Sequence, residues 1–197
     1  HEDPGDVDQT VTVPDIGTEL ADGMTDTHVA QFSADTVLVD KVAYKNLIPG
    51  KEYYLTGTLY DKESGEELTD PEGNIVTSSA SFVPENSDGI SKIEFIVDTT
   101  SLQQKMIVAF ETLMYENRVI AIHADIDDES QTVGVADIYT TATDEQGDKN
   151  IDAGRNVDII DHVQYENLTP GKEYVVRGIL MYSGTGEVYH DPDDHAV

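Results

Sequence analysis

The chain has 197 residues, of which 40 are acidic and 11 are basic, and its formal net charge is −29. This charge argues against nucleic acid and against an anionic membrane surface as partners, because binding their phosphates requires Lys and Arg. The absence of Cys excludes disulfides and Cys-derived thioesters, while 38% hydrophobic and 26% charged residues are typical of a folded globular protein.

Short strands joined by turns are predicted along the central part of the chain. Apolar residues alternate through Thr36–Tyr44 and Tyr53–Tyr60, and the Pro49-Gly50 pair between them is typical of a type II turn. Further strands are predicted, in chain order, at 76–82, 92–97, 105–115, 119–124 and 131–135. Many short strands at regular spacing, with no sustained helical period, predict an all-β fold that is a β-sandwich or a partly closed barrel.

The sequence repeats itself over the length of a whole domain. Residues 1–11 recur as residues 123–133, and residues 46–53 recur as residues 167–174. This period is too long for a solenoid unit and fits a complete domain. We therefore expect residues 1–14 to be the last strand of one repeat, residues 15–136 to form a complete repeat (the middle repeat), and residues 137–197 to be the first half of a third.

Five polar residues of the middle repeat share predicted strand faces with apolar residues. These residues are Thr18, Asp40, Glu111, His123 and Gln131. Burying each of them alone would be costly. Burial becomes tolerable if the five side chains meet and satisfy one another, so we expect them to form one cluster.

Such a cluster has a definite chemistry. A Thr hydroxyl becomes a nucleophile when a base takes its proton, and His123 is the natural base for Thr18. Asp40 and Glu111, if desolvated together, would share a proton, and the protonated acid could donate a hydrogen bond to the Gln131 carbonyl. Attack by Thr18 Oγ on the Gln131 side-chain carbon would expel ammonia and leave an ester, with folding supplying the proximity and a dry core protecting the product.

Four segments in this order resemble the VaFE-repeat, or T-Q ester-bond, domain of Gram-positive surface adhesins. They are Ile16-Gly17-Thr18, residues 39–50, Val108-Ala109-Phe110-Glu111, and the stretch from His123 through Gln131-Thr132-Val133. The resemblance implies tandem Ig-like β-sandwich domains, each with a self-formed Thr–Gln ester assisted by acids and a His. Carried over by position, the ester joins Thr18 to Gln131, and Asp40, Glu111 and His123 assist. Asp98 and Glu94 are alternatives to Glu111 as the second acid.

The partial repeats carry only parts of this set. Thr140 and Asp161 match Thr18 and Asp40 in the third repeat, and His1 and Gln9 match His123 and Gln131 in the first. Neither partial repeat holds a full set of groups, so neither is expected to close its own ester.

The resemblance also implies a function and a location. We expect a structural stalk module of an extracellular, cell-wall-anchored adhesin, which reacts once with itself and is not a turnover enzyme. Neighbouring repeats are its expected partners, with any host ligand bound by another domain. No apolar run is long enough to cross a membrane, so no membrane insertion of this segment is expected.

Three other functions remain open at this point. A Lys–Asn isopeptide domain usually has its Lys on the first strand, but here the first basic residue is Lys41. A hydrolase using Asp40, Glu111 and His123 is disfavoured because the three side chains face a core and no nucleophile elbow is present. A calcium-dependent ligand-binding module is suggested only by the acidic runs.

Those acidic runs are at Asp125, Asp127, Asp128 and Glu129, and at Asp191, Asp193 and Asp194. Carboxylates suit Ca²⁺, but neither run has the ordered spacing of an EF-hand loop. A solvated acidic surface is the favoured interpretation, so no metal or cofactor is expected, with calcium kept as the alternative.

Overall fold

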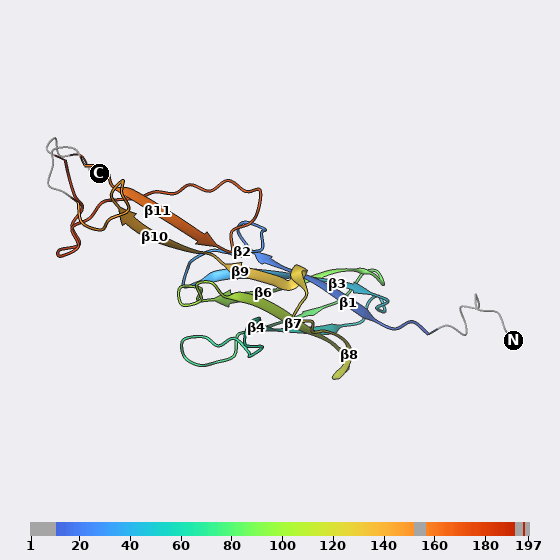
Figure 1. Cartoon of the computed structure of the whole chain (residues 1–197). Helices are drawn as coiled ribbons and strands as arrows, with labels where there is room; N and C mark the ends of the chain where they lie inside the picture. Colours follow the sequence, from blue (N-terminus) through green and yellow to red (C-terminus); the bar gives the residue numbers. More distant parts are fainter. Residues whose placement is uncertain (1–10, 152–156, 192–194, 196–197) are drawn as a thin grey trace.

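The computed structural model describes residues 11–151, 157–191 and 195, and the middle repeat within it is a β-sandwich (Figure 1). The first sheet is antiparallel and has the order β1-β3-β6. Its strands are β1 (Asp15–Asp22), β3 (Thr36–Lys45) and β6 (Gly89–Val97). Strand β1 is therefore an edge strand, with Thr18 opposite Val42 and Leu20 opposite Asp40.

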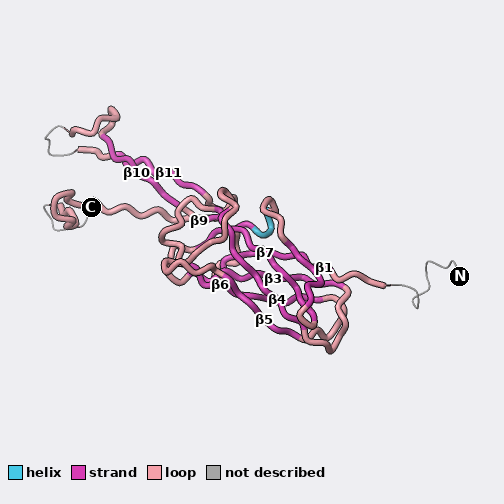
Figure 2. The backbone as a smooth tube through the Cα atoms, turned by 90° about the horizontal axis from the view of Figure 1, so that it is seen from below, coloured by secondary structure: helices cyan, strands magenta, loops and turns pink. Residues whose placement is uncertain are grey.

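The second sheet has the order β2-β9-β7-β4-β5, with β8 pairing with β7 off this path. Its strands are β2 (Val29–Ala30), β4 (Tyr53–Asp61), β5 (Thr77–Phe82), β7 (Met106–Tyr115), β8 (Arg118–His123) and β9 (Thr132–Val135). A 3-10 turn, η2 (Glu129–Gln131), leads into β9. In Figure 2 this turn is the short cyan segment beside the magenta strands.

Alternation along the strands builds the core between the two sheets. In β3, and in β1 as far as Leu20, exposed or half-exposed residues alternate with buried ones, as expected for strands that cover one side of a sandwich. Fully buried apolar side chains from both sheets meet in the centre: Leu20, Leu38, Leu55, Leu59, Phe95, Ile107, Leu113 and Val133. The sandwich thus buries the inner face of β1, on which Thr18 lies.

Gly57 marks a place where the two sheets approach closely. It lies on β4, directly opposite Glu111 on β7. A Cβ atom at this position would contact the Ile93 side chain and would lie 2.6 Å from Phe95 Cζ on the opposite sheet. The absence of a side chain at Gly57 therefore leaves room for the core of the first sheet beside the acidic residue.

The third repeat begins with the same hairpin register as the middle one. Strands β10 (Asp137–Thr143) and β11 (Ile160–Glu166) pair antiparallel, with Thr140 opposite Val163 and Ala142 opposite Asp161. These pairs match the pairing of Thr18 with Val42 and of Leu20 with Asp40. The internal repetition read from the sequence is therefore also a repetition of strand pairing.

The predicted all-β sandwich is confirmed, and each predicted strand has a counterpart, with differences at strand ends and in one pairing. Strand β6 begins at Gly89 rather than at residue 92, and Gln131 ends the η2 turn rather than beginning a strand. A bulge between Leu113 and Met114 shifts the pairing of β8, so that Val119 is exposed although Ala121 packs on the core.

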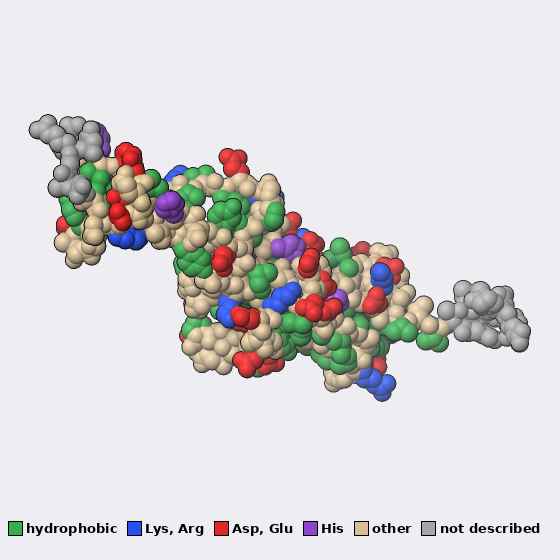
Figure 3. Space-filling model, in the orientation of Figure 1, with side chains coloured by type: hydrophobic (Ala, Val, Ile, Leu, Met, Phe, Trp, Pro, Cys, Tyr) green, Lys and Arg blue, Asp and Glu red, His purple; other side chains and the backbone are tan. Residues whose placement is uncertain are grey.

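The visible surface carries many acidic side chains among fewer basic ones, in agreement with the net charge (Figure 3). Within the described part of the chain, no helix is both long and apolar enough to cross a membrane.

Candidate functional site

The five predicted side chains come together between the two sheets. Thr18 is on β1 and Asp40 is on β3 in the first sheet, while Glu111 is on β7 and His123 is on β8 in the second. Gln131 lies at the end of η2, just before β9. All except His123 are buried, and Asp40 and Gln131 are entirely inaccessible to solvent.

Thr18 and Gln131 are in direct contact. The Gln131 amide nitrogen lies within hydrogen-bonding contact of Thr18 Oγ, although the two residues are 113 positions apart in the sequence. The same nitrogen donates a hydrogen bond to Glu111 Oε2 at 2.6 Å. A potential nucleophile, a carboxamide and a carboxyl group therefore meet in one buried space, across the interface of the two sheets.

The two acids form a pair that retains a proton. Burial and then the negative charge of Glu111 raise the pKa of Asp40 to about 9. Burial also raises the pKa of Glu111, against the opposing effect of hydrogen bonds from Asp40, Gln131 and Thr18. Two like charges in a dry space cannot both ionise cheaply, so at neutral pH the pair holds a proton, mainly on Asp40.

The hydrogen-bond inventory of this pair agrees with a shared proton. With both acids ionised, the Asp40 carboxylate would have only the weak support of the Glu19 backbone N–H, and Oε1 of Glu111 would have no donor among the described residues. A buried, unsatisfied charge of this kind would be strongly destabilising. A proton on Asp40 allows it to donate to Glu111 and removes one of the two charges.

The amide of Gln131 is turned differently from our expectation. We expected the protonated acid to donate to the Gln131 carbonyl, but the amide nitrogen faces Glu111, and Oε1 has no donor among the residues described. The acid pair is thus placed next to the atom that would leave as ammonia, rather than next to the carbonyl oxygen.

His123 is positioned at the rim of the cluster by a neighbouring acid. It lies directly opposite Glu111 in the pairing of β7 with β8, and its Nε2 is 2.9 Å from Asp128 Oδ2. A hydrogen bond from Ser130 and, after it, the one from His123 hold the pKa of Asp128 below its ordinary value. An ionised Asp128 fixes the orientation of the imidazole, as a carboxylate does for a catalytic His.

Sequence reasoning missed Asp128, which was assigned to a solvated acidic run. Its side chain is only 24% exposed and also caps η2, accepting the backbone N–H of Ser130 at 2.8 Å. The Ser130 hydroxyl in turn lies 3.1 Å from the Thr18 carbonyl oxygen. The signal available in the sequence was the Asp-x-Ser spacing of a capped turn immediately before Gln131.

The alternatives for the second acid are placed elsewhere. Glu94 is exposed on β6, and Asp98 accepts hydrogen bonds from Thr100 in a loop. Lys41, the first basic residue, forms an ion pair with Asp26 at 2.7 Å on the surface. Glu111 is therefore the acid beside Asp40, and Lys41 lies outside the cluster.

The counterparts in the third repeat lie on the surface. Thr140 and Asp161 occupy the expected register positions on β10 and β11, and both are exposed. His1 and Gln9 lie outside the described residues. Among the residues that the structure describes, the complete set comes together in the middle repeat.

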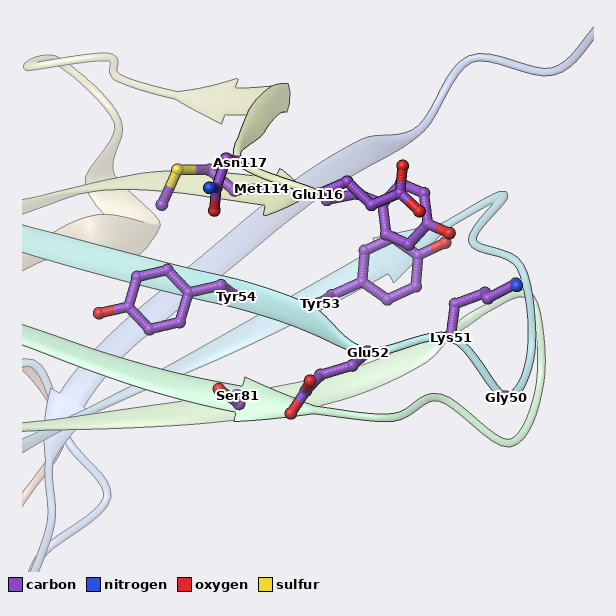
Figure 4. Close-up of a pocket in the computed structure, with 10 residues that line it drawn as sticks. Gly50, Lys51, Glu52, Tyr53, Tyr54, Ser81, Met114, Glu116 and Asn117 are labelled. Atoms are coloured by element: carbon purple, nitrogen blue, oxygen red, sulfur yellow. The ribbon is translucent and has the colours of Figure 1, made fainter.

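Two further features lie outside the cluster. A surface pocket at the ends of β4 and β7 is separate from it (Figure 4). This pocket is lined by Gly50, Lys51, Glu52, Tyr53, Tyr54, Ser81, Met114, Tyr115, Glu116 and Asn117. Within the described ranges, no group of three or more His, Asp or Glu side chains is arranged to hold a metal ion.

Comparison with known proteins places these observations in a family. The sequence model of the T-Q ester bond containing domain matches residues 14–135 and again residues 136–196. No curated protein matches the chain.

Two solved structures illustrate the structural similarity. A bacterial adhesin from Mobiluncus mulieris, described as containing intramolecular disulfide, isopeptide and ester bond cross-links, superposes with a TM-score of 0.51 at 13% identity. That match covers 79% of this chain and 76% of the adhesin. A β-galactosidase from Bacteroides fragilis has a TM-score of 0.42 at 15% identity, over 64% of this chain and 18% of that enzyme. At 13% identity, the similarity to the adhesin shows a shared β fold and nothing more.

Proposed function

Since the chain belongs to the family of T-Q ester bond containing domains, we propose that its middle repeat joins Thr18 to Gln131 through an intramolecular ester that it forms by itself. The observation that carries this proposal is the buried contact of the Thr18 hydroxyl with the Gln131 amide beside a protonated acid pair. The ester would link the two sheets covalently, since Thr18 is on β1 and Gln131 precedes β9.

The first step is activation of the nucleophile. His123 takes the proton of Thr18 Oγ while Asp128 holds the imidazole in place and stabilises the charge that forms on it. The contact of β1 with β8 and the position of His123 opposite Glu111 support this role. Thr18 Oγ then attacks the side-chain carbon of Gln131 and gives a tetrahedral intermediate.

The second step is loss of ammonia. The carbon–nitrogen bond of the intermediate breaks as Glu111, 2.6 Å from Nε2, passes to the leaving nitrogen the proton that it shares with Asp40. The proton taken up by His123 restores the acid pair, so that a hydroxyl and a carboxamide become an ester and one ammonia. Ammonia leaves the site, so the reaction is not reversed, and burial of the product keeps water from hydrolysing the ester.

A structural role in a stalk follows from this chemistry. The module reacts once with its own residues and is not a turnover enzyme. We place it in an extracellular, cell-wall-anchored adhesin of a Gram-positive bacterium, where tandem repeats resist extension and proteolysis. The tandem family matches and the ester cross-links named for the Mobiluncus adhesin support this assignment. The chemistry as proposed requires no metal or cofactor.

Alkaline hydroxylamine tests the chemical nature of the bond. Hydroxylamine cleaves esters and spares isopeptide bonds, so the treated chain should gain the mass of hydroxylamine at Gln131 and recover a free Thr18. Peptide mapping by tandem mass spectrometry locates both residues. A cross-linked peptide that survives this treatment would refute an ester.

The His123–Asp128 pair should control the rate of ester formation. We expect His123→Ala and Asp128→Asn to slow closure, roughly 100-fold or more for the His variant, as is typical when a general base is removed. A time course of intact mass after refolding measures this rate. His162→Ala, at an exposed position of the third repeat, is the control, and closure of His123→Ala at the control rate would remove His123 from the mechanism.

The acid pair should make the uncross-linked fold sensitive to alkali. In Thr18→Val, which cannot form the ester, Asp40 binds its proton with a pKa of about 9 when folded, against 3.8 as the ordinary value. At pH values between these two pKa values, the folded state thus binds one more proton than the unfolded state. The free energy of unfolding must therefore fall as pH rises through this range, by up to about 1.4 kcal/mol per pH unit. Denaturant unfolding between pH 7 and pH 9 measures the slope.

Asn at position 40 keeps the shape of the protonated acid but cannot titrate. We therefore expect Thr18→Val/Asp40→Asn to lose most of the slope in this pH range, in which surface carboxylates are already ionised. Equal slopes in the single and double variants would show that Asp40 does not carry the proton.

A further inference from the structure

The joint between the middle repeat and the third is very short. Strand β9 ends at Val135 and β10 begins at Asp137, so that Ala136 alone separates the two repeats. At the first joint Pro14 alone separates Val13, the counterpart of Val135, from β1, which begins at Asp15. A linker of one residue leaves little room for independent rotation, and any contact across it sets the angle between repeats.

One such contact occurs at both joints with the same atoms. Asn167 Nδ2 donates a hydrogen bond to the carbonyl oxygen of Val135 at 3.1 Å. Asn46 Nδ2 donates to the carbonyl oxygen of Val13 at 2.9 Å. Each Asn directly follows the strand that pairs with the first strand of its repeat, namely β3 and β11.

The backbone at the two Asn residues is also the same. Asn46 has φ of 61° and Asn167 has φ of 57°, a left-handed conformation that Asn tolerates better than most residues. This conformation turns the chain at the end of the hairpin and aims the side-chain amide at the preceding repeat. The choice of Asn thus serves both the turn and the contact.

At the second joint the amide contact is supported by packing. A Cβ atom on the buried Gly134 of β9 would lie 2.9 Å from Asn167 Cβ and 3.1 Å from Met106 Sδ. Gln104 Nε2 of the middle repeat also donates to Asp137 Oδ2 at 3.2 Å. The first joint has Thr12 at the position of Gly134, so the amide contact is the part shared by both.

We propose that the Asn after the second hairpin strand of each repeat is a clamp for the last strand of the repeat before it, fixing the angle between neighbours. The partner of this surface is the preceding repeat of the same chain, and its ligand group is the backbone carbonyl two residues before the first strand of the next repeat, that of Val135 or of Val13. Asn46 and Asn167 are the two examples. The clamp acts on Val135, at the end of β9, and β9 directly follows the cross-linked residue Gln131. In a stalk under load, force would therefore pass from the ester through β9 directly to the next repeat.

A distance measurement across the second joint tests this proposal. The chain has no Cys, so spin labels can be attached at Glu94→Cys on β6 and Thr141→Cys on β10, both exposed positions. Asn167→Gly keeps the left-handed backbone and removes the amide. Losing one such hydrogen bond should shift the ratio of clamped to open joints by roughly fivefold, which broadens the distribution of label distances measured by pulsed electron resonance.

The matched control is Asn46→Gly, the same substitution in the same backbone conformation at the joint outside the label pair. It should leave the distribution as narrow as in the unsubstituted labelled chain. Asn167→Asp, which keeps the shape but replaces the donor by an oxygen that repels the Val135 carbonyl, should also broaden it. A narrow distribution in both Asn167 variants would overturn the clamp.

Amide hydrogen exchange of residues 137–143 and 160–166 completes the test. Protection of this hairpin should persist in both Asn167 variants. If both lose it, Asn167 belongs to the folding of its own hairpin and the clamp is likewise refuted. The outcome is independent of the ester, because a chain with Thr18→Val should show the same dependence on Asn167.

Discussion

Thr18→Val is expected to lower the Tm of the middle repeat by about 10–25 °C, since an ester that closes a loop of 113 residues should contribute about 4–5 kcal/mol through the restricted unfolded chain. Val has nearly the same shape as Thr, so the packing of β1 on the core is retained. Differential scanning calorimetry of the two chains at one pH measures the difference.

The third repeat offers a matched control for this comparison. Thr140→Val makes the same change at the equivalent position of β10, where the side chain is exposed. Its expected Tm is that of the unsubstituted chain. Equal Tm values for all three chains would mean that Thr18 stabilises nothing beyond an ordinary strand residue.

Mechanical extension should show the second large effect. When the chain is pulled from its ends, the segment between Thr18 and Gln131 cannot lengthen while the ester is intact. In Thr18→Val the same 113-residue separation should be released on unfolding, adding about 380 Å at roughly 3.4 Å per residue. Since the two side chains already touch in the folded state, nearly all of this length is gained.

Single-molecule force spectroscopy measures this release. The Thr140→Val chain should extend like the unsubstituted one, because it keeps the pair Thr18 and Gln131 and changes only an exposed position of β10. Treatment of the unsubstituted chain with alkaline hydroxylamine should restore the long step. An unfolding step of equal length in the unsubstituted chain and in Thr18→Val would exclude a covalent link between β1 and η2.

Much of the site could be predicted because the period of a strand assigns side chains to faces. The alternation in β1 and β3 placed Thr18 and Asp40 inward, and the structure buries both. Glu111 was identified in the same way on β7, whose apolar neighbours mark the inner face. Period 2 is a local property, so it can be read without knowledge of which strands pair.

The remaining features depend on contacts that are distant in sequence. Asp128 resembled its acidic neighbours, and only its approach to His123 distinguishes it from solvated surface. Gln131 was placed on a strand because β9 is buried on both faces and shows no alternation that would mark its start. The sheet order could not be predicted, because it arises from long-range pairing that strand patterns alone do not encode.

Intact mass spectrometry of the purified chain tests the central claim most directly. We predict a mass lower than that of the sequence by one ammonia, because Thr18 and Gln131 are in contact beside the acid pair and lose one ammonia when they join. Thr18→Val should have the full mass of its sequence, while Thr140→Val should still be one ammonia lighter. An unsubstituted chain with the full mass of its sequence would contradict the account.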